Sequence, residues 1–147
     1  MDTKARLEND LKGAMRAGDD LRKSTLRMAL SAIRLAEVEK GEALDDNAVL
    51  SILQKEIKSH QESIEDAQHA NRPDLVGPAM ERIQLLESYL PQQFTSEELE
   101  GLARQVIDEV GASGPRDMGR VMKVLIARLE GRASGDQASL VVRKLLQ

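Results

Sequence analysis

The feature that most constrains this chain is a long row of apolar residues at helical spacing in its first half. The row has 3-4-3-4-3 spacing and consists of Leu50, Leu53, Ile57, His60, Ile64 and Ala67, of which only His60 is not apolar. This spacing places them on one face of an α-helix, whereas a half-buried strand requires strict alternation. Similar rows recur along the chain, and Val and Ile form no alternating runs. The sequence therefore predicts an all-α protein of seven helices.

Four of these helices are expected in the first part of the chain. They cover residues 2–17, about 21–39, a long segment capped near Asp45, and about 74–89. The second carries two neighbouring apolar stripes, so we expect it to contact more than one helix and to lie centrally in a bundle. One stripe contains Leu26, Ala29, Leu30 and Ile33, and the other contains Leu21, Thr25, Met28, Ala32 and Leu35. Its polar strip holds Lys23, Arg27 and Arg34, which suits either solvent or ion pairs with acidic neighbours.

A domain boundary is expected near residue 91. Pro91 ends the fourth helix, and Thr95 with Glu98 forms the capping box of a fifth helix that continues to about Val110. A sixth helix follows, and Ser134 with Gln137 caps the seventh. We therefore expect an N-terminal helical domain of about four helices over residues 1–91 and a C-terminal three-helix domain over residues 92–147.

Composition excludes several kinds of chemistry. The chain of 147 residues has no Cys, which rules out disulfides, thiolate metal sites and cysteine catalysis. It has no apolar run of about 18 residues, so no membrane span is expected. The first residues lead into helical pattern without a signal segment, and we expect a cytoplasmic location.

Metal, cofactor and catalytic sites are not expected either. Asp66 and His69 form a single acid–His pair, whereas a carboxylate-bridged di-metal bundle needs two such motifs. His60, inside an apolar row, is expected to be a partly buried, hydrogen-bonded side chain rather than a ligand. No Ser-x-x-Lys, Gly-x-Ser-x-Gly or Walker-type ATP loop is present, and Ser24 and Thr25 have no His nearby in sequence.

A cationic helix face in residues 111–136 is the strongest indication of a binding function. Arg116, Arg120 and Lys123 share one face, opposite a stripe made by Met118, Val121, Met122, Leu125 and Leu129. The net charge is −4 for the whole chain, yet residues 116–147 hold seven cations and three anions. Such a face suits a polyanion such as nucleic acid, and it also suits an ordinary solvated helix.

Several segments, in the same order, resemble the YqeY-like proteins. These segments are residues 21–28 (LRKSTLRM), 53–58 (LQKEIK), 62–64 (ESI), 89–95 (YLPQQFT), 117–122 (DMGRVM) and 131–133 (GRA). The resemblance covers essentially the whole chain. It implies two helical domains, of which the second is similar to the tail of the B subunit of the glutamine-dependent aspartyl/glutamyl-tRNA amidotransferase.

In that enzyme the tail helps to hold tRNA, while the chemistry lies in other domains. The resemblance therefore implies tRNA, or a tRNA-amidotransferase or other aminoacyl-tRNA complex, as the partner of a non-catalytic accessory protein. The candidate RNA-binding positions that it implies are Arg116, Arg120, Lys123, Gly131 and Arg132. Ser134 and Asp136 stand where the family often has an acid and Lys, and His60 stands where it often has Arg.

Two other functions stay open from the sequence. The resemblance to the amidotransferase suggests a carbon–nitrogen ligase with glutamine as the amide donor, although the sequence shows no activated nucleophile. A protein–protein interaction module without RNA, including a homo-oligomer, suits the long third helix. RNA binding through phosphates would weaken steeply with salt, whereas apolar helix docking would not.

Overall fold

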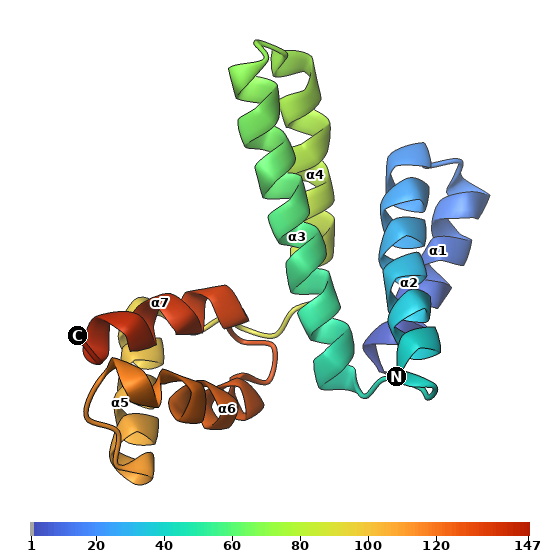
Figure 1. The fold of residues 1–147 in the computed structure, drawn as a ribbon. Helices are drawn as coiled ribbons and strands as arrows, with labels where there is room; N and C mark the ends of the chain where they lie inside the picture. The colour runs from blue at the N-terminus through green and yellow to red at the C-terminus, as the bar shows by residue number, and fades with distance from the viewer. Residues whose placement is uncertain (1) are drawn as a thin grey trace. The chain divides into compact units, whose positions relative to one another are not determined.

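The computed structural model describes residues 2–147 and is helical throughout. Seven α-helices and two 3₁₀ turns are present over those residues, with no strand among them, which confirms the predicted all-α class. The chain divides into two compact units, residues 1–90 and 91–147. Figure 1 shows the helices of both units.

The N-terminal unit contains helices α1 (Thr3–Ala17), α2 (Asp20–Lys40), α3 (Asp46–His69) and α4 (Val76–Glu87), with the 3₁₀ turn η1 (Pro73–Leu75) before α4. Helices α1 and α2 form one hairpin, and α3 and α4 form another (Figure 1). The fourth helix is shorter than the expected 74–89, because a 3₁₀ turn precedes it and residues 88–90 form a turn before Pro91.

The core of this unit is aliphatic except for Tyr89. Its fully buried large side chains are Leu7, Leu26, Leu30, Ile33, Leu53 and Leu86. Each such side chain contributes about 1.5–3 kcal/mol by leaving water. His60 is buried, as its place in the apolar row predicted, while burial and the nearby Arg82 cation lower its pKa.

Polar contacts fix how the helices of this unit meet. The backbone N–H of Thr3 donates to the Asp46 carboxylate at 2.9 Å, which joins the starts of α1 and α3. Lys4 pairs with Glu37 at 2.8 Å and ties α1 to α2. The Tyr89 hydroxyl donates to the Asp10 carboxylate, so the segment after α4 is held against α1.

The second apolar stripe of α2 departs from expectation. Thr25 is buried, but Met28 and Leu35 are exposed, so this stripe is covered only in part. The prediction that the helix contacts more than one other helix is confirmed, because α2 packs against α1, α3 and α4. The first stripe, around Leu30, faces α1 and the core. A helical wheel identifies an apolar stripe but cannot identify whether another element covers it.

The C-terminal unit contains α5 (Ser96–Val110), the 3₁₀ turn η2 (Pro115–Asp117), α6 (Met118–Leu129) and α7 (Gly135–Leu145). All three helices contact one another around a second aliphatic core. Both predicted capping boxes are present, at Thr95 with Glu98 and at Ser134 with Gln137. These caps satisfy the free N–H groups at the starts of α5 and α7 and so define where each helix begins.

Candidate nucleic-acid interface

Helix α6 separates apolar and cationic side chains as its sequence predicted. Val121, Leu125 and Leu129 are buried in the C-terminal core. Arg120 and Lys123 are exposed, and Arg116 is exposed in the 3₁₀ turn that leads into the helix. The three cations therefore belong to the solvated side of a helix whose other side is fixed by packing.

Asp117 organises the entrance to α6. Its carboxylate accepts a hydrogen bond from the backbone N–H of Ser113 at 3.0 Å and another from the Arg120 guanidinium at 3.0 Å. The Ser113 hydrogen bond and the Arg120 cation hold the pKa of Asp117 below its usual range. Arg120 is thus partly neutralised, although its side chain remains 59% exposed.

Arg116 and Lys123 differ from Arg120 in having no anionic partner within residues 2–147. The remaining α6 cation, Arg128, reaches Glu109 of α5 at 2.5 Å and serves packing between the two helices. A cation that forms no ion pair within the protein can bind an external anion without first breaking an internal contact. Arg116 and Lys123 are therefore the positions of this face best suited to an external anion.

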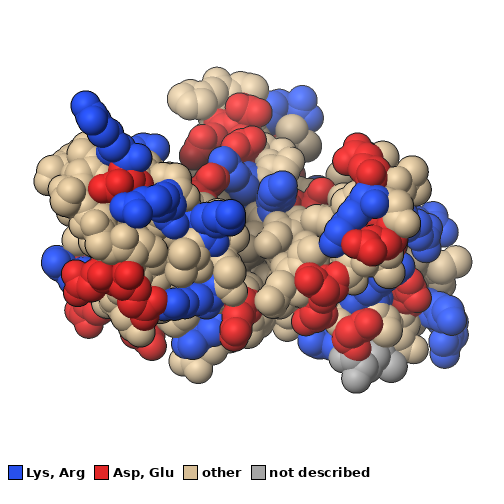
Figure 2. Space-filling model, turned by 60° about the horizontal axis from the view of Figure 1, so that its bottom comes forward, with Lys and Arg blue, Asp and Glu red and all other residues tan. Residues whose placement is uncertain are grey.

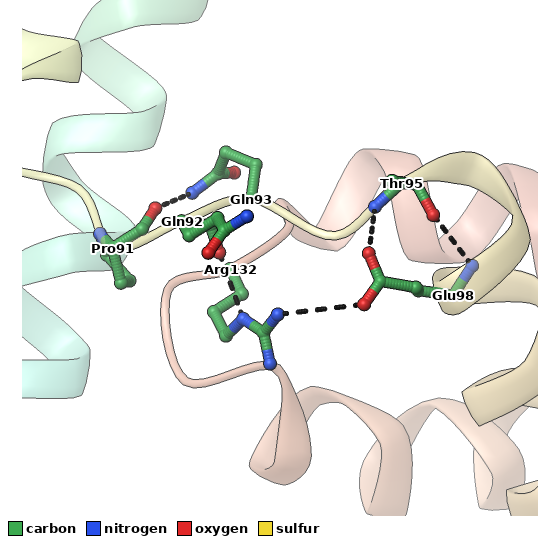
Figure 3. Close-up of polar contacts among 6 residues, drawn as sticks. All are labelled: Pro91, Gln92, Gln93, Thr95, Glu98 and Arg132. Carbon is green, nitrogen blue, oxygen red and sulfur yellow. Dashed lines mark hydrogen bonds and ion pairs between the residues drawn. The ribbon is translucent and has the colours of Figure 1, made fainter.

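Arg132 lies in a different setting. It belongs to a linker clasp, which we define as Gln92, Gln93, Phe94, Gly131 and Arg132. Figure 3 shows three of these residues, Gln92, Gln93 and Arg132. The Arg132 Nε donates to the backbone carbonyl of Gln92 at 2.9 Å. Its guanidinium lies 4.1 Å from the centroid of the Phe94 ring, and the Phe94 N–H donates to the Arg132 carbonyl at 2.8 Å. Arg132 thus holds the segment before α5 against the turn between α6 and α7.

The other side-chain hydrogen bonds of the clasp are also donated to backbone carbonyls. Gln93 Nε2 donates to the Gly131 carbonyl at 2.9 Å and to the Pro91 carbonyl at 2.8 Å. Gly131 has φ +77°, a left-handed conformation that favours glycine. Arg132 also lies 3.9 Å from Glu98, whose pKa is lowered mainly by the Thr95 backbone N–H (Figure 3). The structure therefore gives Gly131 and Arg132 internal roles that the sequence did not indicate.

Two further cations were not among the predicted site residues. Arg143 and Lys144 are exposed in the last turn of α7 and have no ion pair within the described part of the chain. Figure 2 shows, on the face that it presents, Lys and Arg side chains in small groups separated by acidic and uncharged residues.

Two hydroxyl groups that could be considered as nucleophiles form hydrogen bonds with the backbone instead. Ser24 and Thr25 both donate to the carbonyl of Leu21, at 3.1 and 2.7 Å. Thr25 is also buried. Nucleophilic catalysis requires a hydroxyl beside a general base, and these two hydroxyls are directed at a peptide carbonyl within their own helix.

Over residues 2–147, no group of three or more His, Cys, Asp or Glu side chains could hold a metal ion. No helix of that part combines the length and the apolar character needed to cross a membrane. The structure thus defines a class: a small all-helical protein in two units, the second of which presents a cationic helix face.

The family is shown by comparison with known proteins. The chain belongs to the family described as Yqey-like protein, which matches residues 4–146. This finding confirms the resemblance inferred from the sequence.

Similar curated proteins carry the name "Altered inheritance of mitochondria protein 41, mitochondrial". The protein of Lachancea thermotolerans is 37% identical over 118 residues, which cover 78% of this chain and 63% of that protein. The protein of Pyrenophora tritici-repentis is 33% identical over 130 residues, covering 87% and 71%. The protein of Kluyveromyces lactis is 35% identical over 115 residues, covering 76% and 62%. The chain thus spans less than two thirds of the first and third of these relatives.

The expected cytoplasmic location is wrong, because these relatives are named as mitochondrial proteins. The prediction rested on the lack of Cys and of a signal segment. Absence of Cys argues against an oxidising compartment but does not distinguish one reducing compartment from another. Such negative features therefore could not identify the location.

Proposed function

We propose that this protein is a non-catalytic accessory protein that docks structured RNA of the tRNA type through the exposed face of α6. The observation that carries the proposal is the arrangement of Arg116, Arg120 and Lys123 opposite the buried stripe of that helix. Its resemblance to an amidotransferase tail supports tRNA, free or within an aminoacyl-tRNA-handling complex, as the partner.

The chemistry expected at this face is phosphate neutralisation. Arg and Lys side chains release counterions from phosphates when they bind, which makes affinity strongly salt-dependent. The C-terminal unit has one aromatic residue, Phe94, and its ring is stacked beneath Arg132. This unit therefore has no free aromatic side chain on which an RNA base could stack. Recognition of the RNA would depend on its shape and on contacts with its phosphate backbone.

The test is a titration of the whole protein with tRNA at low and near-physiological salt. Because Arg120 is engaged by Asp117, the sharper variant is Arg116→Gln with Lys123→Gln. Removing two phosphate contacts should reduce the slope of log affinity against log salt by about 1.5 and lower the affinity at low salt about tenfold. Arg120→Glu with Lys123→Glu should lower it further without unfolding the protein.

The matched control is Lys12→Gln with Lys55→Gln, which removes the same charge from exposed positions of α1 and α3. This control should keep the affinity and the salt slope of the original protein. Equal effects of the two double variants would show that only net charge matters and would refute the α6 face. An unrelated structured RNA that binds as tightly as tRNA would refute the preference for tRNA.

We also propose that the two units are separate domains of four and three helices that meet near Pro91. Support comes from their separate aliphatic cores and from the Pro that follows Leu90. The C-terminal three-helix domain would then carry the RNA contacts. Expression of residues 91–147 alone tests this: cooperative unfolding is expected, and an unfolded fragment would refute it.

A further inference from the structure

An exposed apolar row on α2 has no role in the function proposed above. Met28, Leu35 and Val38 are 52%, 62% and 78% exposed, although Leu26, Ala29, Leu30 and Ile33 of the same helix are fully buried. Ser24 and Ser31 complete the row, which has 4-3-4-3 spacing. We call these five residues the α2 seam. At roughly 100° per residue they occupy about 80° of arc on the side away from the buried stripe.

The spacing of the α2 seam is that of a helix–helix contact. A 3-4 repeat keeps one row of side chains against a second helix over several turns. Ser24 precedes Met28, and Ser31 lies between Met28 and Leu35, so these two small residues leave room for side chains of a second helix. Scattered single apolar residues on a surface need no explanation, whereas Met28, Leu35 and Val38 share one helical row.

The charged residues beside the α2 seam indicate which kind of partner helix could bind there. Arg27 and Arg34 line one edge of the α2 seam and are exposed. Neither forms an ion pair among residues 2–147, although the charge of Arg34 helps to lower the pKa of Glu37, which is paired with Lys4. Lys23 lies on the same edge, 3.7 Å from Asp20, whose carboxylate is almost fully exposed. The opposite edge carries no cation, being formed by Leu21, Ala32 and Glu39. A docked helix would therefore meet positive charge along one side only.

We propose that the α2 seam binds an amphipathic helix of a partner protein that has apolar residues at 3-4 spacing and carboxylates along one edge. The apolar residues would cover Met28, Leu35 and Val38, and the carboxylates would pair with Arg27 and Arg34. This interaction is independent of RNA docking by α6, because it uses other residues in the other unit.

A second copy of the chain fits this surface less well. In an antiparallel pair of α2 helices centred on Ser31, Arg27 of each copy would lie beside Arg34 of the other, so like charges would meet twice. In a parallel pair Arg34 would approach Glu39 of the other copy, but Arg27 would still have no anion. A helix with an acidic edge satisfies both arginines, which is why charge favours a different protein.

A lipid surface also fits less well. Helices that lie in a membrane interface carry a broad apolar face with cations on its polar side. The α2 seam has only three large apolar side chains among its five residues, and its cations are confined to one edge. This narrow, one-sided pattern matches a groove between two helices rather than a bilayer.

The experiment uses a designed, fluorescently labelled helical peptide as the probe, with Leu at the a and d positions of each heptad and Glu at e and g. Its glutamates repel one another and keep the free peptide from pairing with itself. Titration of the whole protein into this peptide, followed by fluorescence anisotropy, should show saturable one-to-one binding. A peptide with Lys in place of Glu should bind at least about tenfold more weakly.

Two variants test the two parts of the surface. Leu35→Ser with Val38→Ser should weaken binding of the Glu peptide at least about tenfold, and it should leave the fold intact because both side chains are exposed. Arg27→Glu with Arg34→Glu should reverse the preference, so that the Lys peptide binds better than the Glu peptide. Lys12→Glu with Lys55→Glu is the charge-matched control and should keep the original preference.

Three results would overturn the proposal. Equal binding of the Glu and Lys peptides would show that charge on this edge selects nothing. A concentration-dependent dimer in sedimentation that the Leu35/Val38 variant abolishes would make a second copy the occupant. Binding to vesicles containing anionic lipid, lost in the same variant, would make a membrane the occupant. The RNA titration of the α6 variants is unaffected by any of these outcomes.

Discussion

Replacement of Arg132 by Ala should loosen the linker clasp and destabilise the C-terminal unit. The change removes a hydrogen bond from a charged donor to the Gln92 carbonyl at 2.9 Å, which is worth about 1 kcal/mol at a side chain that is 37% exposed. It also removes a cation–π contact with Phe94 at 4.1 Å, worth about 0.5–1 kcal/mol. The ion pair with Glu98, at 3.9 Å and half exposed, adds little.

The total is about 2 kcal/mol, which for a unit of this size corresponds to a fall in melting temperature of roughly 10 °C. Hydrogen exchange of the whole protein, read separately for peptides from the two units, is the appropriate assay. Peptides from α5 and α7 should lose protection in the Arg132→Ala variant. Peptides from α1 and α2 should exchange as in the original protein, because these three interactions of Arg132 lie within residues 91–147.

Arg116→Ala is the matched control, since it removes an exposed Arg of the same unit that has no ion pair among the described residues. Arg132→Lys keeps the charge but loses the planar guanidinium, so it should recover only a small part of the stability. If Arg132→Ala exchanges like Arg116→Ala, the clasp contributes no stability and the reasoning is refuted. The Arg132 position would then be available for RNA contact instead.

Three further predictions concern other parts of the chain. Tyr89→Phe should lower the free energy of unfolding of the N-terminal unit by about 1–2 kcal/mol in urea titrations, because it leaves the Asp10 carboxylate without its hydroxyl donor. Burial and Arg82 lower the pKa of His60, so its contribution to stability is complete above its unfolded pKa of 6.5 and declines as the pH falls below it. His60→Leu should therefore reduce the loss of stability between about pH 7 and pH 5, and an unchanged slope would refute this assignment. Thr95→Ala should cost about 1 kcal/mol by removing the cap of α5, whereas Thr95→Ser should cost much less, as measured by thermal unfolding.

Features that depend on near neighbours in sequence were predictable here. The caps at Thr95 and Ser134 are followed three residues later by Glu98 and Gln137, and both boxes form. The buried stripe of α6 was likewise evident from its 3-4 spacing. These features use contacts within a single helical turn or face, so the sequence contains nearly all the information that determines them.

Features that depend on distant partners were not predictable. Arg132 and Gln92 are 40 residues apart in sequence, and no local pattern indicates their hydrogen bond. The assignment of Arg132 to RNA came from the family resemblance, which carries no information about the neighbours of this side chain in the folded unit. The exposure of Met28 and Leu35 was missed for the same reason: whether an apolar stripe is covered depends on the rest of the unit.

The single Tyr of the chain has a practical consequence for spectroscopy. Tyr89 is buried in the N-terminal unit, beneath Arg6 and beside Asp10, and the chain has no Trp. Ultraviolet emission and near-ultraviolet dichroism from this ring therefore report mainly on the N-terminal unit, whereas far-ultraviolet dichroism reports on all seven helices. During a single urea titration, two midpoints that differ would show that the units unfold one after the other. The protein thus contains its own optical probe for the independence of its two units, with no label and no substitution.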